Sequence, residues 1–155
     1  MNMAKFMCFS LFVASLLLFT ACHKDDDDTT TPNKELVVGD WKFAGFLVLN
    51  KPENSASPIT APEGCGALQT WSFNADGSHH FIHYEKSGND CVESTRRTGT
   101  YTFNENTKDL AITYPNETET FSVYKVTETE MWWNLGTIDY NGNTTDYLHI
   151  LVFKK

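Results

Sequence analysis

The sequence lacks the short motifs that identify common enzyme classes. Its 155 residues contain no G-x-S-x-G elbow, no glycine-rich phosphate loop and no H-E-x-x-H pair, so a serine hydrolase, a P-loop protein and a zinc protease have no support. Paired carboxylates for glycoside hydrolysis have no fixed spacing in sequence, and an enzyme therefore stays open as the last alternative. We expect a non-enzymatic protein that needs no cofactor.

Positive charge is also scarce. Lys and Arg number 12 against 20 Asp and Glu, which gives a formal net charge of −8. From residue 35 onward, 16 acidic residues face 9 basic ones, so this part alone carries −7. An acidic chain without a basic stripe argues against nucleic acid and against anionic lipid headgroups as partners.

The N-terminal hydrophobic run is too short for a comfortable membrane span. FMCFSLFVASLLLF covers residues 6–19, whereas a spanning helix needs about 20 residues. One basic residue, Lys5, precedes the run, and the small residues Thr20-Ala21 follow it. This order is typical of a secretory signal peptide, which we place at residues 1–21.

The stretch FTAC, residues 19–22, resembles the lipobox of bacterial lipoproteins, in which the cysteine is acylated and the chain is cut just before it. The resemblance implies that an acylated Cys22 anchors the protein to outer-membrane lipid, since several acyl chains give durable anchoring. Phe19 stands where this family usually has leucine. The alternative is an ordinary signal peptide in which Cys22 is incidental.

The acidic segment HKDDDD, residues 23–28, allows three interpretations. Carboxylates bind calcium, but consecutive aspartates without a loop glycine repel one another, which disfavours a metal site. A solvated flexible tether over residues 22–34 is the second interpretation. The third is a resemblance to the surface-export signal of Bacteroidetes lipoproteins, formed here by Lys24, Asp25, Asp26, Asp27 and Asp28. It implies a lipid-anchored protein on the cell surface, with an inward-facing periplasmic location as the alternative.

Cysteine is rare, and two of the four, Cys8 and Cys22, belong to the processed N-terminus. The remaining Cys65 and Cys91 would meet an oxidising compartment after export, which favours a disulfide. If Asp76-Gly77 form a two-residue hairpin turn, position 65 lies opposite position 88 and Cys91 comes within reach. Two buried thiols are the alternative, and a zinc site is disfavoured because neither cysteine belongs to a C-x-x-C pair.

Apolar stripes with the helical period are absent, whereas period-two patterns between turn signals recur. They predict an all-β domain at residues 35–155. Its eight strands are expected at residues 36–49, 67–73, 78–85, 95–103, 110–114, 119–126, 130–139 and 145–153. Short connections favour an eight-stranded antiparallel up-and-down barrel, because a closed barrel has no edge strands.

The turn signals also predict which side chains point into the barrel. With a two-residue turn at Asp76-Gly77, residues whose numbers sum to 153 face each other, and the inward face carries Trp71, Phe73, His80, Ile82 and Tyr84. The middle strands are expected to complete the wall with Tyr101, Phe103, Leu110, Ile112, Phe121 and Val123.

A two-residue turn at Asn141-Gly142 makes the same kind of prediction for the last two strands. Residues whose numbers sum to 283 then pair, which points one apolar set inward: Met131, Trp133, Leu135, Leu148, Ile150 and Val152. The opposite face would carry Trp132, Leu151 and Phe153, an apolar patch suited to a protein partner if it stays exposed.

A family resemblance agrees with this strand count. The segment VVGDWKF, residues 37–43, contains the G-x-W with which the first strand of lipocalins opens, and WSFNADGSHHF followed by GTYTF resembles small lipocalin-like lipoproteins of Bacteroidetes. The resemblance implies a barrel closed at its base by Gly39 and Trp41, with the tryptophan packed under a late arginine. No arginine follows Arg97, so Lys154 would have to take that place.

The histidines offer little for metal chemistry. His79 and His83 share a strand face but lie about 13 Å apart at ~3.3 Å per residue, too far for one metal ion. We therefore predict no metal site. His80 is either a residue that orients a ligand or a hydrogen-bonded core histidine.

Two function classes follow. The first is a binding module with a small apolar ligand in the barrel mouth, as the lipocalin resemblance implies. Its candidate ligand-binding residues are Trp71, Phe73, His80, Tyr101 and Trp133. The second is an interaction scaffold for a protein or glycan, in which side chains fill the barrel. A continuous internal pocket favours the first class, and a packed interior with an exposed aromatic patch favours the second.

Overall fold

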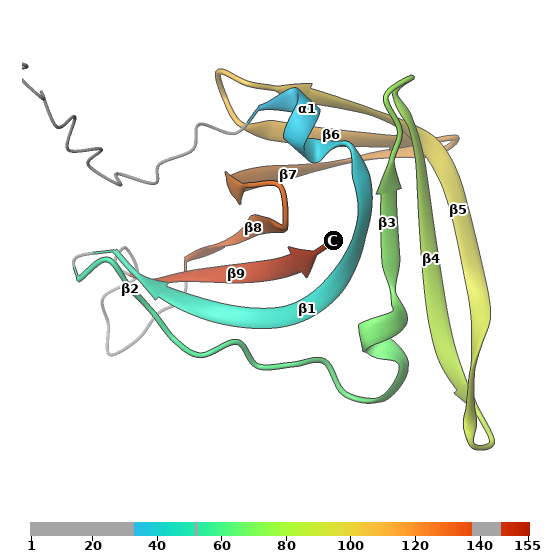
Figure 1. The fold of residues 1–155 in the computed structure, drawn as a ribbon. Coiled ribbons are helices and arrows are strands. Elements are labelled where there is room, and N and C mark those ends of the chain that lie inside the picture. Colours follow the sequence, from blue (N-terminus) through green and yellow to red (C-terminus); the bar gives the residue numbers. More distant parts are fainter. Residues whose placement is uncertain (1–32, 52, 138–146) are drawn as a thin grey trace, which may run out of the picture.

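An antiparallel β-sheet that closes on itself forms the protein (Figure 1). The computed structural model describes residues 33–51, 53–137 and 147–155. Its elements are α1 (Lys34–Val37), β1 (Gly39–Asn50), β2 (Ser55–Ala56), the 3-10 helix η1 (Gly64–Leu68), β3 (Thr70–Phe73), β4 (Ser78–Ser87), β5 (Asp90–Asn104), β6 (Asp109–Tyr114), β7 (Glu117–Val126), β8 (Glu130–Thr137) and β9 (Tyr147–Lys154). β1 pairs with β3 on one side and with β9 on the other, while β2 adds to the end of β1. Eight strands thus make a ring, and the predicted barrel is confirmed.

The beginning of the domain differs from the predicted strand over 36–49. The side chain of Asn33 accepts a hydrogen bond from the backbone N–H of Glu35 at 2.7 Å and caps the short helix α1. β1 consequently starts only at Gly39. The second predicted strand is also shortened, because η1 replaces its first residues. Among the described residues, no helix is long and apolar enough to cross a bilayer.

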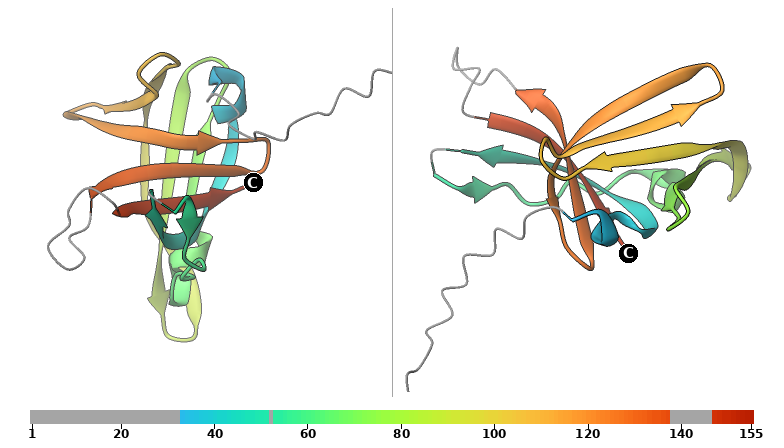
Figure 2. Two further views of the ribbon diagram at one scale, coloured as in Figure 1. Left: turned by 90° about the vertical axis from the view of Figure 1, so that its left-hand side faces the viewer. Right: turned by 90° about the horizontal axis from the view of Figure 1, so that it is seen from above.

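β1 bends halfway along its length and so belongs to both halves of the barrel (Figure 1). The bend coincides with a β-bulge between Phe43 and Gly45, where Gly45 has a φ of 132°. Just beyond it, Phe46 and Thr60 exchange two backbone hydrogen bonds, of 3.0 and 2.7 Å. Because β1 turns here, β3–β5 cross β7–β9 at a steep angle (Figure 2, left).

The β4–β5 hairpin is the longest in the molecule and projects beyond the rest of the barrel (Figure 1). A disulfide between Cys65 of η1 and Cys91 of β5 ties it to the preceding segment, with the two Cα atoms 5.6 Å apart. The predicted Cys65–Cys91 pair is therefore confirmed. In the chain-entropy model a loop of this size is worth roughly 3–4 kcal/mol of stability.

The predicted register of the β3–β4 hairpin is wrong by one residue. The backbone N–H of Asn74 donates to Ser78 O at 2.9 Å, which leaves three residues in the loop, with Gly77 at a φ of 85°. A three-residue loop of this kind ends in a left-handed residue, usually glycine. Trp71 consequently pairs with Phe81, and Phe73 with His79. Since a one-residue shift exchanges the two faces of a strand, His80, Ile82 and Tyr84 point away from the face of Trp71 and Phe73.

The β8–β9 register is also shifted by one residue from the prediction. Trp133 pairs with Leu151 rather than Ile150, and Met131 pairs with Phe153. The predicted turn at Asn141-Gly142 lies outside the described residues. The inner face of these strands therefore joins the main core, which is centred on Trp41, Phe73, Trp133 and Phe153.

The predicted apolar patch on the opposite face does not exist in the expected form. Phe153 is fully buried in the main core, and Leu151 packs against that core. Trp132 packs instead against a second cluster on the other face of β1 and β9, made of Leu47, Leu49, Leu148, Ile150 and Val152. Leu135, which we expected to point inward, is 47% exposed.

Candidate functional site

The barrel is closed at one end and more open at the other. α1 lies at the closed end, where β1 begins (Figure 1). Along the strands, the residues on the inner face change from buried to half-buried with distance from this end. The buried residues, nearer to α1, are Trp41 (β1), His79 (β4), Tyr101 (β5), Val123 (β7) and Phe153 (β9). The half-buried residues on the same face of the same strands, farther from α1, are Phe46, His83, Arg97, Glu119 and Leu151. Because exposure rises in the same direction along five strands, we call the end of the barrel opposite α1 its mouth.

Five half-buried aromatic residues line this mouth, and we call them the aromatic lining: Phe43, Phe46, Trp71, Phe81 and Phe121. Trp71 is at its centre. The centroid of its ring lies 4.5 Å from that of Phe81 and 6.5 Å from that of Phe43. Phe43 in turn lies 5.0 Å from Phe46. Half-buried rings in mutual contact offer apolar surface to a ligand without a backbone rearrangement.

Trp133 joins the aromatic lining to the core. Its ring stacks on Phe121 at 4.4 Å and meets Trp71 edge-on at 6.1 Å, yet Trp133 itself is only 1% exposed. Phe153 lies 4.3 Å behind it. Trp133 therefore forms the floor of the mouth, between half-buried rings and the fully buried core.

A charged group lies at the rim. Arg97 pairs with Phe81 across β4 and β5, so it is on the inner face. Its guanidinium carbon sits 3.4 Å above the ring of Tyr114, and its nitrogens bind Glu117 at 2.5 Å and Glu119 at 3.0 Å. Two carboxylates thus hold one cation in place, which leaves the rim slightly negative.

His79 supports the wall below this rim. It is fully buried between Phe73, on which it stacks at 4.7 Å, and Tyr114. Because the carbonyl oxygen of Ser72 can only accept, the Nδ1 atom 3.0 Å away must donate, and Nε2 is left to accept from the Tyr114 hydroxyl at 3.2 Å. Burial lowers the pKa of His79 to about 4, so the ring is neutral. Burial likewise raises the pKa of the Tyr114 hydroxyl.

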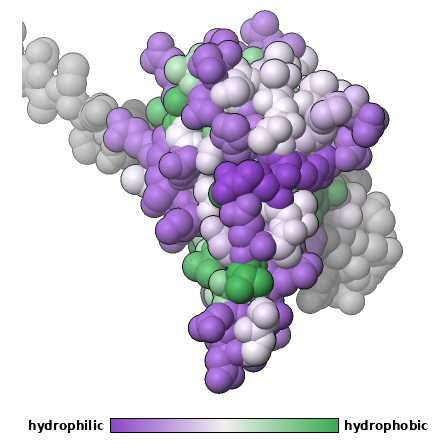
Figure 3. All heavy atoms as spheres, turned by 90° about the vertical axis from the view of Figure 1, so that its right-hand side faces the viewer, coloured by the Kyte–Doolittle hydropathy of each residue, from purple (hydrophilic) through white to green (hydrophobic). Residues whose placement is uncertain are grey.

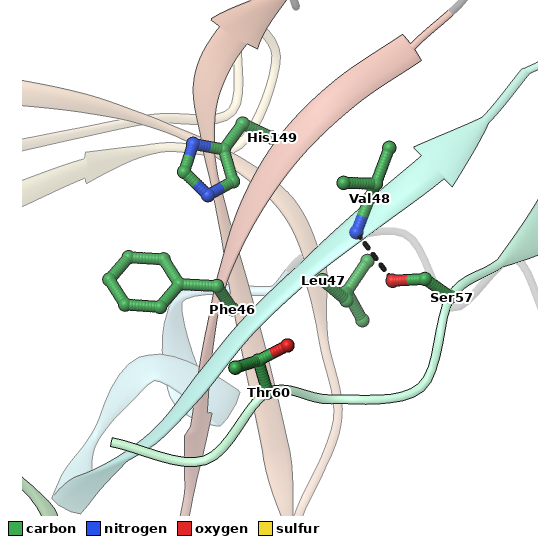
Figure 4. Close-up of a pocket in the computed structure, with 6 residues that line it drawn as sticks. All are labelled: Phe46, Leu47, Val48, Ser57, Thr60 and His149. Atoms are coloured by element: carbon green, nitrogen blue, oxygen red, sulfur yellow. Dashed lines mark hydrogen bonds between the residues drawn. The ribbon is translucent and has the colours of Figure 1, made fainter. Parts of the chain in front are cut away.

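A side cavity of about 260 Å³ adjoins the aromatic lining at Phe46 (Figure 4). The ring of Phe46 stacks on that of His149 at 5.2 Å. Across the cavity, the hydroxyl of Ser57 accepts a hydrogen bond from the backbone of Val48 at 2.9 Å. Thr60 completes the rim, so the cavity is largely apolar with two hydroxyl groups at its edge.

At the closed end Trp41 packs under a cation, as predicted, but the cation is a different residue. Trp41 is fully buried, and its Nε1 donates to the carbonyl oxygen of Val37 at 2.7 Å. The cation over its ring is Lys155, whose Nζ lies 4.5 Å from the ring centroid and also reaches Leu36 O at 3.3 Å. Lys154, which we expected in this position, pairs with Glu130 instead. Gly39 sits beside the Lys155 side chain, where a Cβ atom would come within 2.7 Å of it.

Four of the five candidate ligand-binding residues share the inner face: Trp71, Phe73, Tyr101 and Trp133. Only Trp71 of these is half-buried, since Phe73 and Tyr101 are core residues and the Tyr101 hydroxyl donates to Asn74 O at 2.9 Å. The fifth, His80, pairs with Ser72 and Thr98 on the outer face.

Three inner-face residues were not predicted: Phe46, Phe81 and His79. Phe81 and His79 follow from one signal, the left-handed Gly77 of a three-residue loop, which would have given the correct register. Phe46 depends on the bulge at Gly45, and an isolated glycine inside a strand is the signal that could have indicated this bulge. No group of three or more His, Cys, Asp or Glu side chains that could hold a metal ion occurs in the described part of the chain.

The predicted signal peptide, the acylated Cys22 and the export signal formed by Lys24 and Asp25–Asp28 all lie outside the described residues. They remain predictions.

Comparison with known proteins agrees with the geometry of the barrel. No curated protein matches the sequence significantly. Residues 37–133, more than half of the chain, match the family described as the lipocalin-like domain. This span begins just before Trp41 at the closed end and reaches Trp133 at the floor of the mouth. The chain therefore belongs to the family of lipocalin-like domains.

Proposed function

We propose that this protein binds a small apolar ligand at the open end of its barrel, against the aromatic lining. The observation that carries the proposal is the set of half-buried rings around Trp71, to which Phe121 is joined through Trp133. A lipocalin-like domain suggests a β-barrel that binds small molecules, and such a fold is typically non-enzymatic. The half-buried rings keep apolar surface in contact with water, and covering such surface with an apolar ligand is favourable.

The packing of the core limits the size of the ligand. Trp41, Phe73, Trp133 and Phe153 are buried to 1% exposure or less, so the closed half of the barrel is filled. The side cavity of about 260 Å³ at Phe46 is slightly below the roughly 300–1,000 Å³ usual for ligand pockets. We therefore expect a compact ligand, no larger than a single ring or two fused rings, of which only a part enters the mouth.

The proposal includes a lipid anchor in the cell envelope, as in the Bacteroidetes lipoproteins that the N-terminus resembles. An acylated Cys22 would fix the barrel to outer-membrane lipid, and Asp25–Asp28 would direct it to the cell surface. A Cys22→Ala variant should no longer partition into detergent with the membrane fraction.

Changing the four aspartates to alanine should protect the protein from protease added to whole cells, and equal sensitivity of variant and wild type would refute the export signal.

An interaction scaffold for a protein or glycan is the second candidate. One observation favours it: Leu68 and Val92, near the disulfide, are 43% and 45% exposed. The face of β4 and β5 is otherwise mostly hydrophilic, with small apolar areas in its lower part (Figure 3). This apolar surface is small, and we rank the scaffold below the ligand-binding barrel.

A fluorescent probe tests the ligand-binding proposal. N-phenyl-1-naphthylamine, a neutral apolar dye, should bind wild-type protein with enhanced fluorescence. Phe81→Ala removes a ring that contacts Trp71 and should weaken binding about five- to tenfold, since losing one aromatic contact costs roughly 1–1.5 kcal/mol. Val92→Ala removes exposed apolar surface outside the mouth and should leave binding unchanged. Binding that depends on Val92 but not on Phe81 would overturn the proposal in favour of the scaffold.

A further inference from the structure

The indole N–H of Trp133 is a buried donor without an acceptor. Its Nε1 atom has no hydrogen-bond partner among the described residues, although the side chain is only 1% exposed. Buried donors are almost always paired, so each exception needs an explanation. Trp41 shows the usual arrangement, because its Nε1 donates to Val37 O at 2.7 Å.

The position of Trp133 indicates what could pair with this donor. The residue is on the inner face, opposite Val123 and Leu151, and its nearest neighbours are aromatic rings without strong acceptors. Two of these neighbours, Phe121 and Trp71, belong to the half-buried aromatic lining. A group that enters the mouth and displaces the Phe121 ring would therefore come into contact with Trp133.

We infer that the ligand is an aromatic or alicyclic compound that carries a hydrogen-bond acceptor, such as a ketone or ester carbonyl, and that this acceptor binds Trp133 Nε1–H. The inference rests on the proposed function and narrows it, because a plain hydrocarbon would leave the donor unpaired. A neutral acceptor fits the site better than a carboxylate, because Glu117 and Glu119 outweigh the single charge of Arg97 at the rim.

Two ligands of nearly equal shape separate the acceptor from the apolar body: 2-acetylnaphthalene and 2-ethylnaphthalene. Calorimetric titration of the wild-type protein should give a dissociation constant roughly tenfold lower for the acetyl compound, the effect of one hydrogen bond to an otherwise unpaired donor. Trp133→Phe keeps an aromatic ring without the N–H, so the two affinities should become equal. Trp132→Phe is the matched control, since Trp132 Nε1 is also buried and unpaired but belongs to the second cluster, and this variant should keep the preference.

A second measurement does not depend on the stability of a variant. The four tryptophans give separate indole N–H signals in a ¹⁵N-labelled sample, and the Trp133 signal should move downfield with 2-acetylnaphthalene but not with 2-ethylnaphthalene. Equal affinities in the wild type, or a preference lost in Trp132→Phe, would overturn the inference and leave the binding function standing. If neither compound binds, the proposed function itself fails.

Discussion

His79 is the buried polar side chain on which the wall of the mouth depends. It is fully enclosed, it stacks on Phe73, and it links Ser72 to Tyr114 through its two ring nitrogens. Through Tyr114 it also supports Arg97 at the rim, whose guanidinium lies on the tyrosine ring. One residue thus connects the core with the charged edge of the site.

The neutral state of His79 predicts a stability that depends on pH. The pKa is about 4 in the folded protein and about 6.5 in the unfolded chain. Between these values the unfolded chain binds more protons, so this stabilisation is complete above pH 6.5 and is lost as the pH falls towards 4. Protonation of His79 should therefore lower the free energy of unfolding by roughly 3 kcal/mol between pH 7 and pH 4.

Urea unfolding between pH 4 and 7 measures this effect. His79→Gln lacks the titrating ring and should show a clearly shallower pH dependence than the wild type. His80→Gln, one position along β4 on the outer face, should retain the wild-type slope. The reverse result would place His80 in the core and contradict the register described above.

Lys155 provides the second prediction for a single residue. Its Nζ lies 4.5 Å from the ring centroid of Trp41, and burial lowers its pKa. Lys155→Met should cost about 0.5–1 kcal/mol of unfolding free energy, the usual value of a cation–π contact. Lys154→Met removes only an exposed ion pair with Glu130 and should cost less. A larger loss for Lys154→Met would contradict this assignment of the closing cation.

Among the elements, the strands and the order in which they pair were predicted well, but the register of the β3–β4 and β8–β9 hairpins was not. Alternating patterns located all eight barrel strands, because a half-buried strand must alternate. The number of residues in each turn is a finer property: Asp76-Gly77 suggested a two-residue turn, whereas the loop holds three residues and exchanges the faces of β4. His79 therefore replaces His80 inside the barrel. The bulge that brings Phe46 into the mouth is followed by the backbone pairing of Phe46 with Thr60, a contact outside the strand that the alternating pattern of β1 does not predict.

The bend of β1 yields a prediction at the scale of elements. A Cβ atom at Gly45 would lie 2.0 Å from Thr60 O, in a backbone with a φ of 132°. Gly45→Ala should therefore cost about 2–3 kcal/mol by overpacking and should weaken ligand binding, since Phe46 follows directly. Gly88→Ala, at a φ of 64° with no atom within 4 Å, should cost about 1 kcal/mol without an effect on binding. Thermal unfolding of both variants measures these losses of stability. Equal losses of stability in the two variants would contradict a specific role of Gly45 at the bend of β1.

At the scale of the whole molecule, the barrel combines a filled half and an open half. Trp41, α1 and Lys155 close one end, and Phe46, Trp71, Phe81 and Phe121 leave apolar surface at the other. The G-x-W motif and the strand count predicted the family and the closed end. Which aromatic residues line the open end could not be predicted from the sequence, because those of the core and those of the mouth lie on the same face of the same strands and differ only in depth.

The most direct test of the account is mass spectrometry of small molecules that accompany the protein from its native membrane. Full-length wild-type protein and Trp71→Ala should be purified in parallel under mild conditions, with circular dichroism to confirm that both are folded. We predict one compact apolar compound in near-stoichiometric amount with the wild type and its loss from Trp71→Ala. No accompanying compound, together with no binding of apolar probes by the wild type, would contradict the central claim that this barrel binds a ligand.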